Sequence, residues 1–282
     1  MLREPVAVLG ASGMLGRAVS EALVSGSISH VGLARENVDL RALGDLARSI
    51  PRGTGTVINC AAWTNVDAAE AHEDEATLAN GHAVGQLAAH CRSIGAVLVH
   101  YSSDYVFNGR ASAPYAIDHP RAPLNAYGRS KALGERQLEQ SGCEHLLLRT
   151  SWVYAPWGKN FVRTIVGLAK KRPSLRVVND QLGRPSSAEQ IARVSLALLA
   201  SGAHGTYHVS DDGDCTWFDF ARAAIGELAL PCVVEPCTSA EFPSPAVRPS
   251  YSVLDLSATV ERIGPLVPWR ESLRHVLGRL EG

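Results

Sequence analysis

The stretch Val6-Ala-Val-Leu9, followed at once by Gly10-Ala-Ser-Gly-Met-Leu-Gly16, decides the fold of this 282-residue chain. The four apolar residues favour a short buried strand. Beyond the glycines, Leu15 and Val19 continue an apolar face with helical spacing until Gly26. A glycine loop between a strand and a helix is typical of a dinucleotide-binding βαβ unit, where it permits a tight turn and close backbone approach to a pyrophosphate.

The same alternation of strands and helices continues as far as Thr150. Short apolar runs predict further strands, and 3.6-residue periodicity predicts the helices between them. The predicted strands are His30–Ala34, Thr56–Ala61, Ala96–Tyr101 and His145–Leu148, and the predicted helices are Ala76–Ser93 and Ala126–Gln140. This order predicts an α/β fold with a Rossmann-type, doubly wound parallel sheet.

After Thr150 the alternation loosens and prolines cluster between Pro231 and Pro249. Helical patterns and shorter strand patterns remain there. They are helices at 161–170, 188–199 and 218–228, and strands at 175–178 and 206–209. We therefore expect residues 1–150 to form a dinucleotide-binding domain. Residues 151–282 would mainly form a smaller C-terminal substrate-binding lobe, with returns to the main sheet.

The composition excludes several classes of partner. The formal net charge is −1, so nothing indicates a nucleic-acid partner. Six cysteines occur without metal-ligand spacing. The chain begins without an apolar signal region and contains no apolar run long enough to span a membrane. The expectation is a soluble, cytoplasmic protein without a membrane partner.

Two segments carry residues suited to carbonyl reduction. Tyr127-Gly-Arg-Ser-Lys131 places a tyrosine and a lysine on one helical face, and Tyr101–Phe107 brings Ser103 to the end of the fourth strand. Reducing a ketone develops negative charge on oxygen, which an acid must protonate. An adjacent ammonium lowers a phenol's pKa. We expect Tyr127 to donate the proton, Lys131 to assist it and bind the cofactor ribose, and Ser103 to orient the carbonyl.

The end of the second strand bears on cofactor choice, because an acid there accepts from a ribose 2′-hydroxyl while an arginine accommodates a 2′-phosphate. Arg35 at this point favours NADPH, and an exposed loop position for Arg35 would leave NADH as the alternative. The glycine loop supplies the other cofactor contacts expected from the residues alone. These are Gly10, Ser12, Gly13, Met14, Leu15 and Gly16.

Over nearly its full length the chain resembles the dTDP-4-dehydrorhamnose reductases, which are extended short-chain dehydrogenases. The resemblance rests on several segments besides the glycine loop. They are Val57–Glu70, Tyr101–Phe107, Asn125–Lys131, Leu148–Tyr154, Asn160–Phe161, Asp180–Pro185 and Arg248–Asp255. It implies NAD(P)H-dependent reduction of the 4-keto group of dTDP-6-deoxy-L-lyxo-4-hexulose, giving dTDP-L-rhamnose.

The resemblance also implies roles for individual residues. Ser103, Tyr127 and Lys131 match the catalytic set, with Ser103 standing where many members have threonine. Further cofactor contacts would come from Asp39, Leu40, Ala61, Ala62 and Thr64. Contacts to the nucleotide-sugar substrate would come from Ser103, Asp104, Trp152, Gln181, Arg184 and Arg248.

One position departs from the family pattern. Some bacterial members hold a homodimer through a magnesium ion, and one acidic ligand lies two residues after the third glycine, where this chain has Ala18. We therefore predict no metal, and a homodimer remains among the partners that the resemblance implies.

Three alternative functions stay open at this point. The first is a reductase of another nucleotide-linked 4-keto sugar, of the dihydrostreptose synthase type. The second is a non-catalytic, NADP-binding regulatory subunit like that of methionine adenosyltransferase, against which the Ser103, Tyr127 and Lys131 set argues. The third is an epimerase or dehydratase, which would return the hydride to its substrate.

Overall fold

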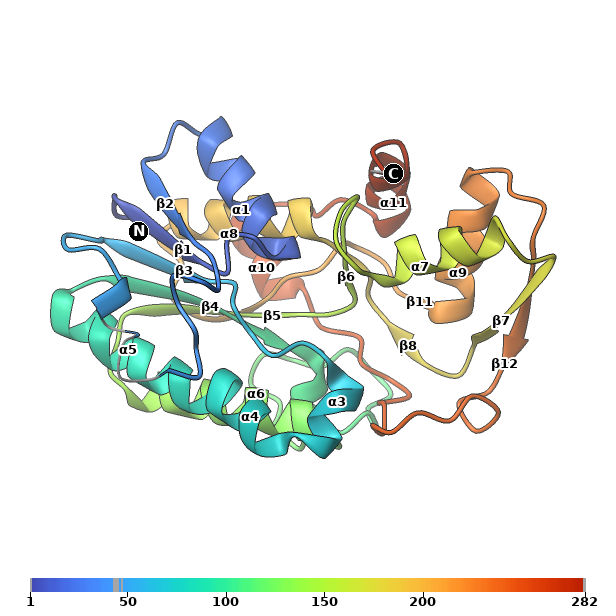
Figure 1. Cartoon of the computed structure of the whole chain (residues 1–282), viewed down its shortest axis with the longest axis horizontal. Coiled ribbons are helices and arrows are strands. Elements are labelled where there is room, and N and C mark those ends of the chain that lie inside the picture. Colours follow the sequence, from blue (N-terminus) through green and yellow to red (C-terminus); the bar gives the residue numbers. More distant parts are fainter. Residues whose placement is uncertain (1, 43–45, 47, 281–282) are drawn as a thin grey trace.

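The computed structural model describes residues 2–42, 46 and 48–280, and its centre is a parallel sheet (Figure 1). The sheet has six strands in the order β10-β5-β4-β3-β1-β2. Their bounds are β1 (Val6–Leu9), β2 (His30–Leu33), β3 (Thr56–Asn59), β4 (Val97–Ser103), β5 (His145–Thr150) and β10 (Gly205–His208). This confirms the predicted α/β class and parallel sheet.

The strand order reverses at β1, which pairs with β2 on one side and with β3 on the other. In open parallel sheets, ligands bind outside the carboxyl ends of the strands at such a reversal. The glycine loop after β1 and the segment after β3 both begin there. The predicted strand Thr56–Ala61 ends early, at Asn59, because the chain turns to pack Ala61 against Gly10.

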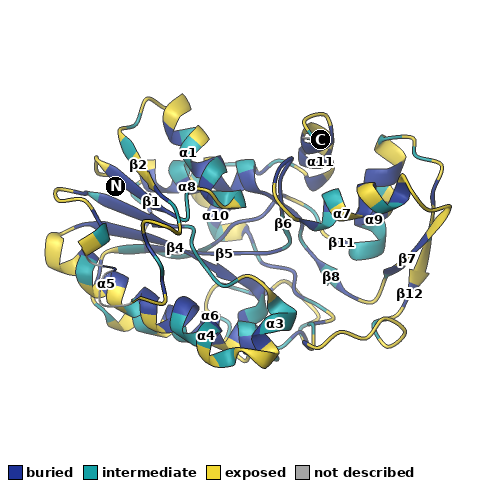
Figure 2. Cartoon of the chain, viewed as in Figure 1, coloured by how far each residue is buried: buried dark blue, intermediate teal, exposed yellow. Residues whose placement is uncertain are grey.

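Helices cover both faces of the sheet, so its central strands β1, β3, β4 and β5 are buried on both sides, whereas the edge strands β2 and β10 are partly exposed (Figure 2). On one face lie α1 (Met14–Ser25), α8 (Ala188–Ala200) and α10 (Ser257–Ile263). The other face carries α3 (Val66–Ala71), α4 (Glu73–Thr77), a π-helical turn (Leu78–His82), α5 (Ala83–Ile94) and α6 (Ala126–Gln140). Val6 and Val8 face the α1 side and Ala7 and Leu9 the α5 side, which is the alternation a strand requires.

The elements after β5 lie mostly beyond the carboxyl edge of the sheet (Figure 1). They include three small sheets, formed by β6 with β9, β8 with β11, and β7 with β12. Their strands are β6 (Val153–Tyr154), β7 (Ser174–Val178), β8 (Leu182–Gly183), β9 (Ser186–Ser187), β11 (Cys215–Thr216) and β12 (Val233–Cys237). The helices among them are α7 (Phe161–Ala169), α9 (Trp217–Glu227) and α11 (Trp269–Leu277). Strand β10 returns to the main sheet beside β5.

Strand β12 lies in the proline-rich region and is not among the predicted strands. It pairs in parallel with β7, and Pro236 stands opposite Val177. A proline is tolerated because β12 has a partner on one side only, so its missing N–H need not face a second strand. In the described ranges, no helix is long and apolar enough to cross a membrane.

Candidate functional site

The glycine loop takes a conformation that a side chain would prevent. Gly10 has a φ of +72°, and its N–H donates to the Leu33 carbonyl at 2.8 Å. A Cβ on Gly10 would lie 2.8 Å from the Ala61 nitrogen, and one on Gly16 would lie 2.1 Å from the Gly10 carbonyl oxygen. Glycine is therefore required at both positions for the loop to pass between β2 and the end of β3.

The loop presents the amino end of α1 to this crevice. Gly13 precedes the helix without a side-chain cap, and the first turn of α1 contains no acidic residue. The backbone N–H groups of a first helical turn attract anions, and here no local carboxylate opposes them. The glycine cradle and the uncapped helix fit the diphosphate of a dinucleotide. Around them, Ser12 and Thr64 are exposed, while Met14, Leu15, Ala61 and Ala62 are partly buried.

On the adenosine side, the structure pairs the predicted Asp39 with an arginine that we did not single out. Arg41 Nε lies 3.1 Å from Asp39 Oδ1, and a second guanidinium nitrogen lies 2.9 Å from Oδ2. These hydrogen bonds lower the pKa of Asp39 to about 2. Arg35 is exposed at the end of β2, and Leu40 is buried in the core with Leu9. The negative charge of Asp39 is thus neutralised by Arg41, with Arg35 nearby.

Ser103 and Tyr127 meet at the carboxyl edge of the sheet. Ser103 ends β4, where it is buried, and Tyr127 lies in the first turn of α6. Burial raises the pKa of Tyr127 above its ordinary value, and a hydrogen bond with Ser103 opposes that shift. The sequence-based expectation was a pKa lowered by Lys131. In this structure burial dominates, so the phenol carries its proton at neutral pH.

Lys131 is almost completely buried beneath the same edge. Its ammonium donates to the Tyr101 carbonyl oxygen at 3.0 Å, which ties α6 to β4. Burial lowers the pKa of Lys131 to about 8, and the charge of Glu135 one turn later opposes this change. The lysine is still mostly cationic at pH 7, so positive charge is held below the site.

Asp104 adds a second titratable group beside Ser103. Ser103 Oγ donates to Asp104 Oδ1 at 2.9 Å, and the Asp104 side chain is 2% exposed. Burial raises the pKa of Asp104 to about 6, while hydrogen bonds from Ser252 and Ser103 oppose the shift. The backbone N–H of Tyr105 donates to Ser103 Oγ at 3.1 Å, so the serine hydroxyl is held from both sides.

The amino end of α6 is fixed by residues that sequence reasoning did not assign to the site. Asn125 caps the helix, because its Oδ1 accepts from the Gly128 N–H at 2.8 Å and its Nδ2 donates to the Val247 carbonyl at 2.9 Å. Glu70 accepts from the Ala126 N–H at 2.8 Å. The spacing Asn-x-x-Gly at a helix start could have indicated the cap.

Close packing then brings α6 against the loop after β4. A Cβ on Gly128 would lie 2.2 Å from the Tyr105 carbonyl oxygen, so only glycine permits this approach. The ring of Tyr105 meets that of Tyr127 edge to face, with centroids 5.9 Å apart. Tyr127 is thereby held beside Ser103.

The predicted substrate residues form two groups around this centre. Arg248 forms an ion pair with Asp67 at 2.9 Å. Burial lowers the pKa of Arg248, but its contacts with Asp67 and Tyr105 outweigh that effect and raise the pKa. Arg184 follows β8, near Tyr251 and 3.5 Å from an Asp212 carboxylate oxygen. Its Nε is buried without a hydrogen-bond partner in the described structure.

Trp152 and Gln181 are already engaged within the protein. Trp152 follows β5, whose Thr150 stands beside Ser103 in the sheet, and its ring stacks on Trp217. Gln181 donates to the Ser239 hydroxyl at 2.8 Å and is 8% exposed. The structure thus brings Trp152 to the catalytic edge, whereas Gln181 supports the neighbouring loop.

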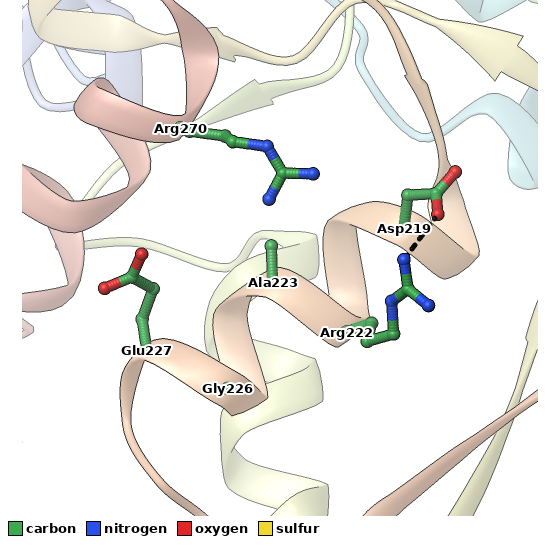
Figure 3. Close-up of a pocket in the computed structure, with 6 residues that line it drawn as sticks. All are labelled: Asp219, Arg222, Ala223, Gly226, Glu227 and Arg270. Carbon is green, nitrogen blue, oxygen red and sulfur yellow. Dashed lines mark hydrogen bonds and ion pairs between the residues drawn. The ribbon is translucent and has the colours of Figure 1, made fainter.

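A separate pocket lies away from these residues, between α9 and α11 (Figure 3). It encloses about 500 Å³. Its lining residues are Asp219, Arg222, Ala223, Gly226, Glu227 and Arg270. Arg222 faces Asp219 at 3.5 Å, so part of the charge is paired locally. None of the predicted site residues lines this pocket. Among the described residues, no cluster of three or more histidine, cysteine or acidic side chains is arranged to hold a metal ion.

Comparison with known proteins decides the family. The family profile described as "RmlD substrate binding domain" matches residues 4–281. The chain belongs to this family. It is 40% identical to a dTDP-4-dehydrorhamnose reductase of Burkholderia thailandensis, with 94% of this chain and 95% of that protein covered. It is 38% identical to a dTDP-4-keto-6-deoxy-D-glucose reductase of Streptomyces niveus, with 94% of each covered.

The fold of this RmlD-family chain also matches solved structures over nearly its whole length. A dTDP-4-dehydrorhamnose reductase of Bacillus anthracis, solved in complex with NADP, superposes with a TM-score of 0.93 at 32% identity. The match covers 98% of this chain and 99% of that one. The resemblance read from the sequence is therefore confirmed at the level of family and fold.

Proposed function

We propose that this chain uses NADPH to reduce the 4-keto group of dTDP-6-deoxy-L-lyxo-4-hexulose, giving dTDP-L-rhamnose. The observation that carries the proposal is that Ser103, at the end of β4, and Tyr127, in the first turn of α6, lie at the same carboxyl edge of the sheet as the glycine loop after β1. Family membership and the reductase names of the relatives support an NADP-dependent oxidoreductase.

The site residues divide the work of carbonyl reduction. When bound, the reduced nicotinamide supplies the hydride. Ser103 orients the carbonyl by hydrogen bonding, and Tyr127, protonated at neutral pH, donates its proton to the oxygen as negative charge develops. The Lys131 ammonium below the edge stabilises that negative charge and binds the cofactor ribose. Asp104, fixed by Ser103, contacts the sugar.

The remaining predicted residues bind the two ends of the ligands. The glycine cradle and the amino end of α1 hold the cofactor diphosphate, and Arg35 with Arg41 accommodates a 2′-phosphate. Arg184 has a buried Nε without a partner, and a charged donor of this kind suits the substrate diphosphate. Arg248 lies beside Tyr105, whose ring packs on Tyr127, so we assign it to the substrate side of the site.

A second candidate function is reduction of a different dTDP-linked 4-keto sugar. It is favoured by the Streptomyces niveus relative, whose similarity nearly equals that of the dTDP-4-dehydrorhamnose reductases. The pocket framework would be shared, so the sugar itself must decide between the two.

The deciding experiment incubates the purified protein with each of several dTDP-linked 4-keto sugars and NADPH or NADH, and identifies the product. We expect stoichiometric NADPH oxidation with formation of dTDP-L-rhamnose. Turnover only with another keto sugar would establish the second candidate. Tight NADPH binding without any turnover would instead indicate a regulatory subunit, and product formation without net NADPH oxidation would indicate an epimerase.

Two further properties belong to the proposal. We propose a homodimer, which sedimentation analysis of the purified chain would test, and a monomer at all concentrations would refute it. We also propose a cytoplasmic location, which fractionation of the source cells would test.

A further inference from the structure

Trp152 and Trp217 form a stacked pair at the edge of the substrate site. Their ring centroids lie 3.6 Å apart and their planes are inclined by only 10°. Trp152 follows β5 beside the catalytic edge, whereas Trp217 opens α9, 65 positions farther along the chain. Both side chains are partly exposed, and both also pack against a buried cluster that includes Phe220.

The backbone of Trp152 has an unfavourable conformation that the pair must help to maintain. Its φ is +47°, in the left-handed region that large side chains rarely occupy. Such a conformation persists only where surrounding contacts determine it, and it is common at ligand sites. The ring also packs closely against Gly183, where a Cβ would lie 2.7 Å from the indole. Trp152 therefore contacts both a glycine backbone and Trp217.

The position of Trp217 is itself fixed by the small sheet of β8 and β11. Cys215 pairs with Gly183 and Thr216 pairs with Leu182, so Trp217 begins one residue after this pairing. Thr216 also caps α9 by accepting from the Asp219 N–H at 3.1 Å. Phe161 of α7 also contacts Trp217, with ring centroids 4.5 Å apart. The indole of Trp217 is thus a fixed surface on which Trp152 rests.

We propose that Trp217 is a positioning residue that holds the Trp152 ring as one wall of the sugar pocket. This inference rests on the proposed function and on the expectation from the family resemblance that Trp152 contacts the nucleotide sugar. Trp217 acts through Trp152, so its loss weakens binding of the nucleotide sugar and leaves the distant cofactor crevice intact. The sequence alone does not indicate this contact, because the two tryptophans are 65 positions apart.

The test combines a spectroscopic signature with steady-state kinetics. Stacked indoles couple their transitions, so the wild-type protein should show an exciton couplet in its circular dichroism spectrum. Trp217→Leu and Trp152→Leu should each abolish it. Trp217→Leu should raise KM for the nucleotide sugar roughly 3- to 10-fold, the range expected for losing an aromatic pair, with the NADPH Kd unchanged. Trp217→Phe keeps an aromatic ring at this position, so its KM for the nucleotide sugar should stay close to the wild-type value.

Double substitution separates positioning from a direct role. In a Trp152→Leu background, Trp217→Leu should change KM no further, because the residue through which it acts is already gone. Trp269→Phe is the matched control, since Trp269 is a buried indole in the same half of the chain outside the stack. It should keep the couplet and the KM.

Two outcomes would overturn the proposal. One is a couplet that survives Trp217→Leu, and the other is an equal rise in KM with and without Trp152. If Trp217→Leu does not fold, Trp217→Phe still decides the spectroscopic part, because phenylalanine cannot form the indole couplet. A wild-type protein that reduces no keto sugar would refute the proposed function, while the couplet would still report whether Trp217 stacks on Trp152.

Discussion

The Lys131 ammonium donates a hydrogen bond to the backbone carbonyl of Tyr101, 3.0 Å away, and so joins the catalytic helix to the central strand β4. Both groups are buried, so the contact fixes α6 as well as holding charge beneath the site. Lys131, which the sequence predicted to assist Tyr127, therefore also has a structural role.

Replacing Lys131 should affect cofactor binding and stability together. Lys131→Met removes the ammonium and leaves the Tyr101 carbonyl without its donor, which should lower the free energy of unfolding by about 1–3 kcal/mol. The NADPH Kd should rise roughly tenfold or more through loss of the ribose contact. Fluorescence titration and denaturant unfolding measure the two effects, with exposed Lys170→Met as control. An unchanged Kd would contradict the ribose role.

The same lysine should shape the alkaline limb of the pH profile. Burial lowers its pKa to about 8, so the cation is present below that pH and is lost above it. The kcat/KM should therefore fall as pH rises through about 8. In Lys131→Arg, any residual activity should lack this fall, because a guanidinium stays charged. A wild-type profile that remains flat well above pH 8 would remove Lys131 from the titration.

Tyr127→Phe deletes only the proton source. The ring still packs against Tyr105, so we expect the fold and the NADPH Kd to stay near wild type. Turnover should fall on the order of 10²- to 10⁴-fold, the usual contribution of a positioned acid. Tyr207→Phe on edge strand β10 is the control. Near-normal turnover in Tyr127→Phe would exclude it as the donor.

Charge at the end of β2 should govern the choice between NADPH and NADH. Arg35→Glu places an acid where a 2′-phosphate would bind, and Arg41→Ala frees the Asp39 carboxylate from its partner. Each should shift the ratio of kcat/KM values towards NADH by roughly tenfold. Arg52→Glu makes an equal charge change at an exposed position. The control Arg52→Glu should keep the wild-type ratio. If Arg35→Glu and Arg41→Ala keep it too, this surface does not bind the 2′-phosphate.

Asp211 should make the folded state sensitive to pH. Its carboxylate is completely buried and accepts from the Tyr154 hydroxyl and the Ser187 N–H, each at 3.1 Å. Burial raises its pKa from 3.8 to about 7. The folded chain binds the proton more tightly than the unfolded chain, so this stabilisation is full below about pH 4 and is lost as pH rises through 7.

Asp211→Asn should therefore raise the free energy of unfolding at pH 8 by about 1–3 kcal/mol, with the smallest effect at pH 4. Urea unfolding at the two pH values measures the difference. Exposed Asp214→Asn should change it at neither pH. Equal stability of wild type and Asp211→Asn at pH 8 would show that burial of this acid costs nothing.

Local sequence was sufficient to predict the strands and helices that have a regular spacing of apolar residues. The strand before Gly10, the helix after Gly13 and the helix that carries Tyr127 were all predicted, because apolar periodicity reflects burial directly. Strand β12 was missed since its prolines mask the pattern, and it is stabilised by pairing with β7. Contacts such as Asp39 with Arg41 depend on side-chain directions that spacing does not specify.

Amino-acid order alone determined the glycine crevice, the parallel sheet and the presence of serine, tyrosine and lysine at its carboxyl edge. Each depends on short-range chemistry: a turn that only glycine permits, a strand that is apolar on both faces, and a helical spacing of four. Tertiary structure alone decided that burial raises the Tyr127 pKa and that Trp217 supports Trp152. Both depend on desolvation and packing between distant segments, which become defined only when the chain has folded.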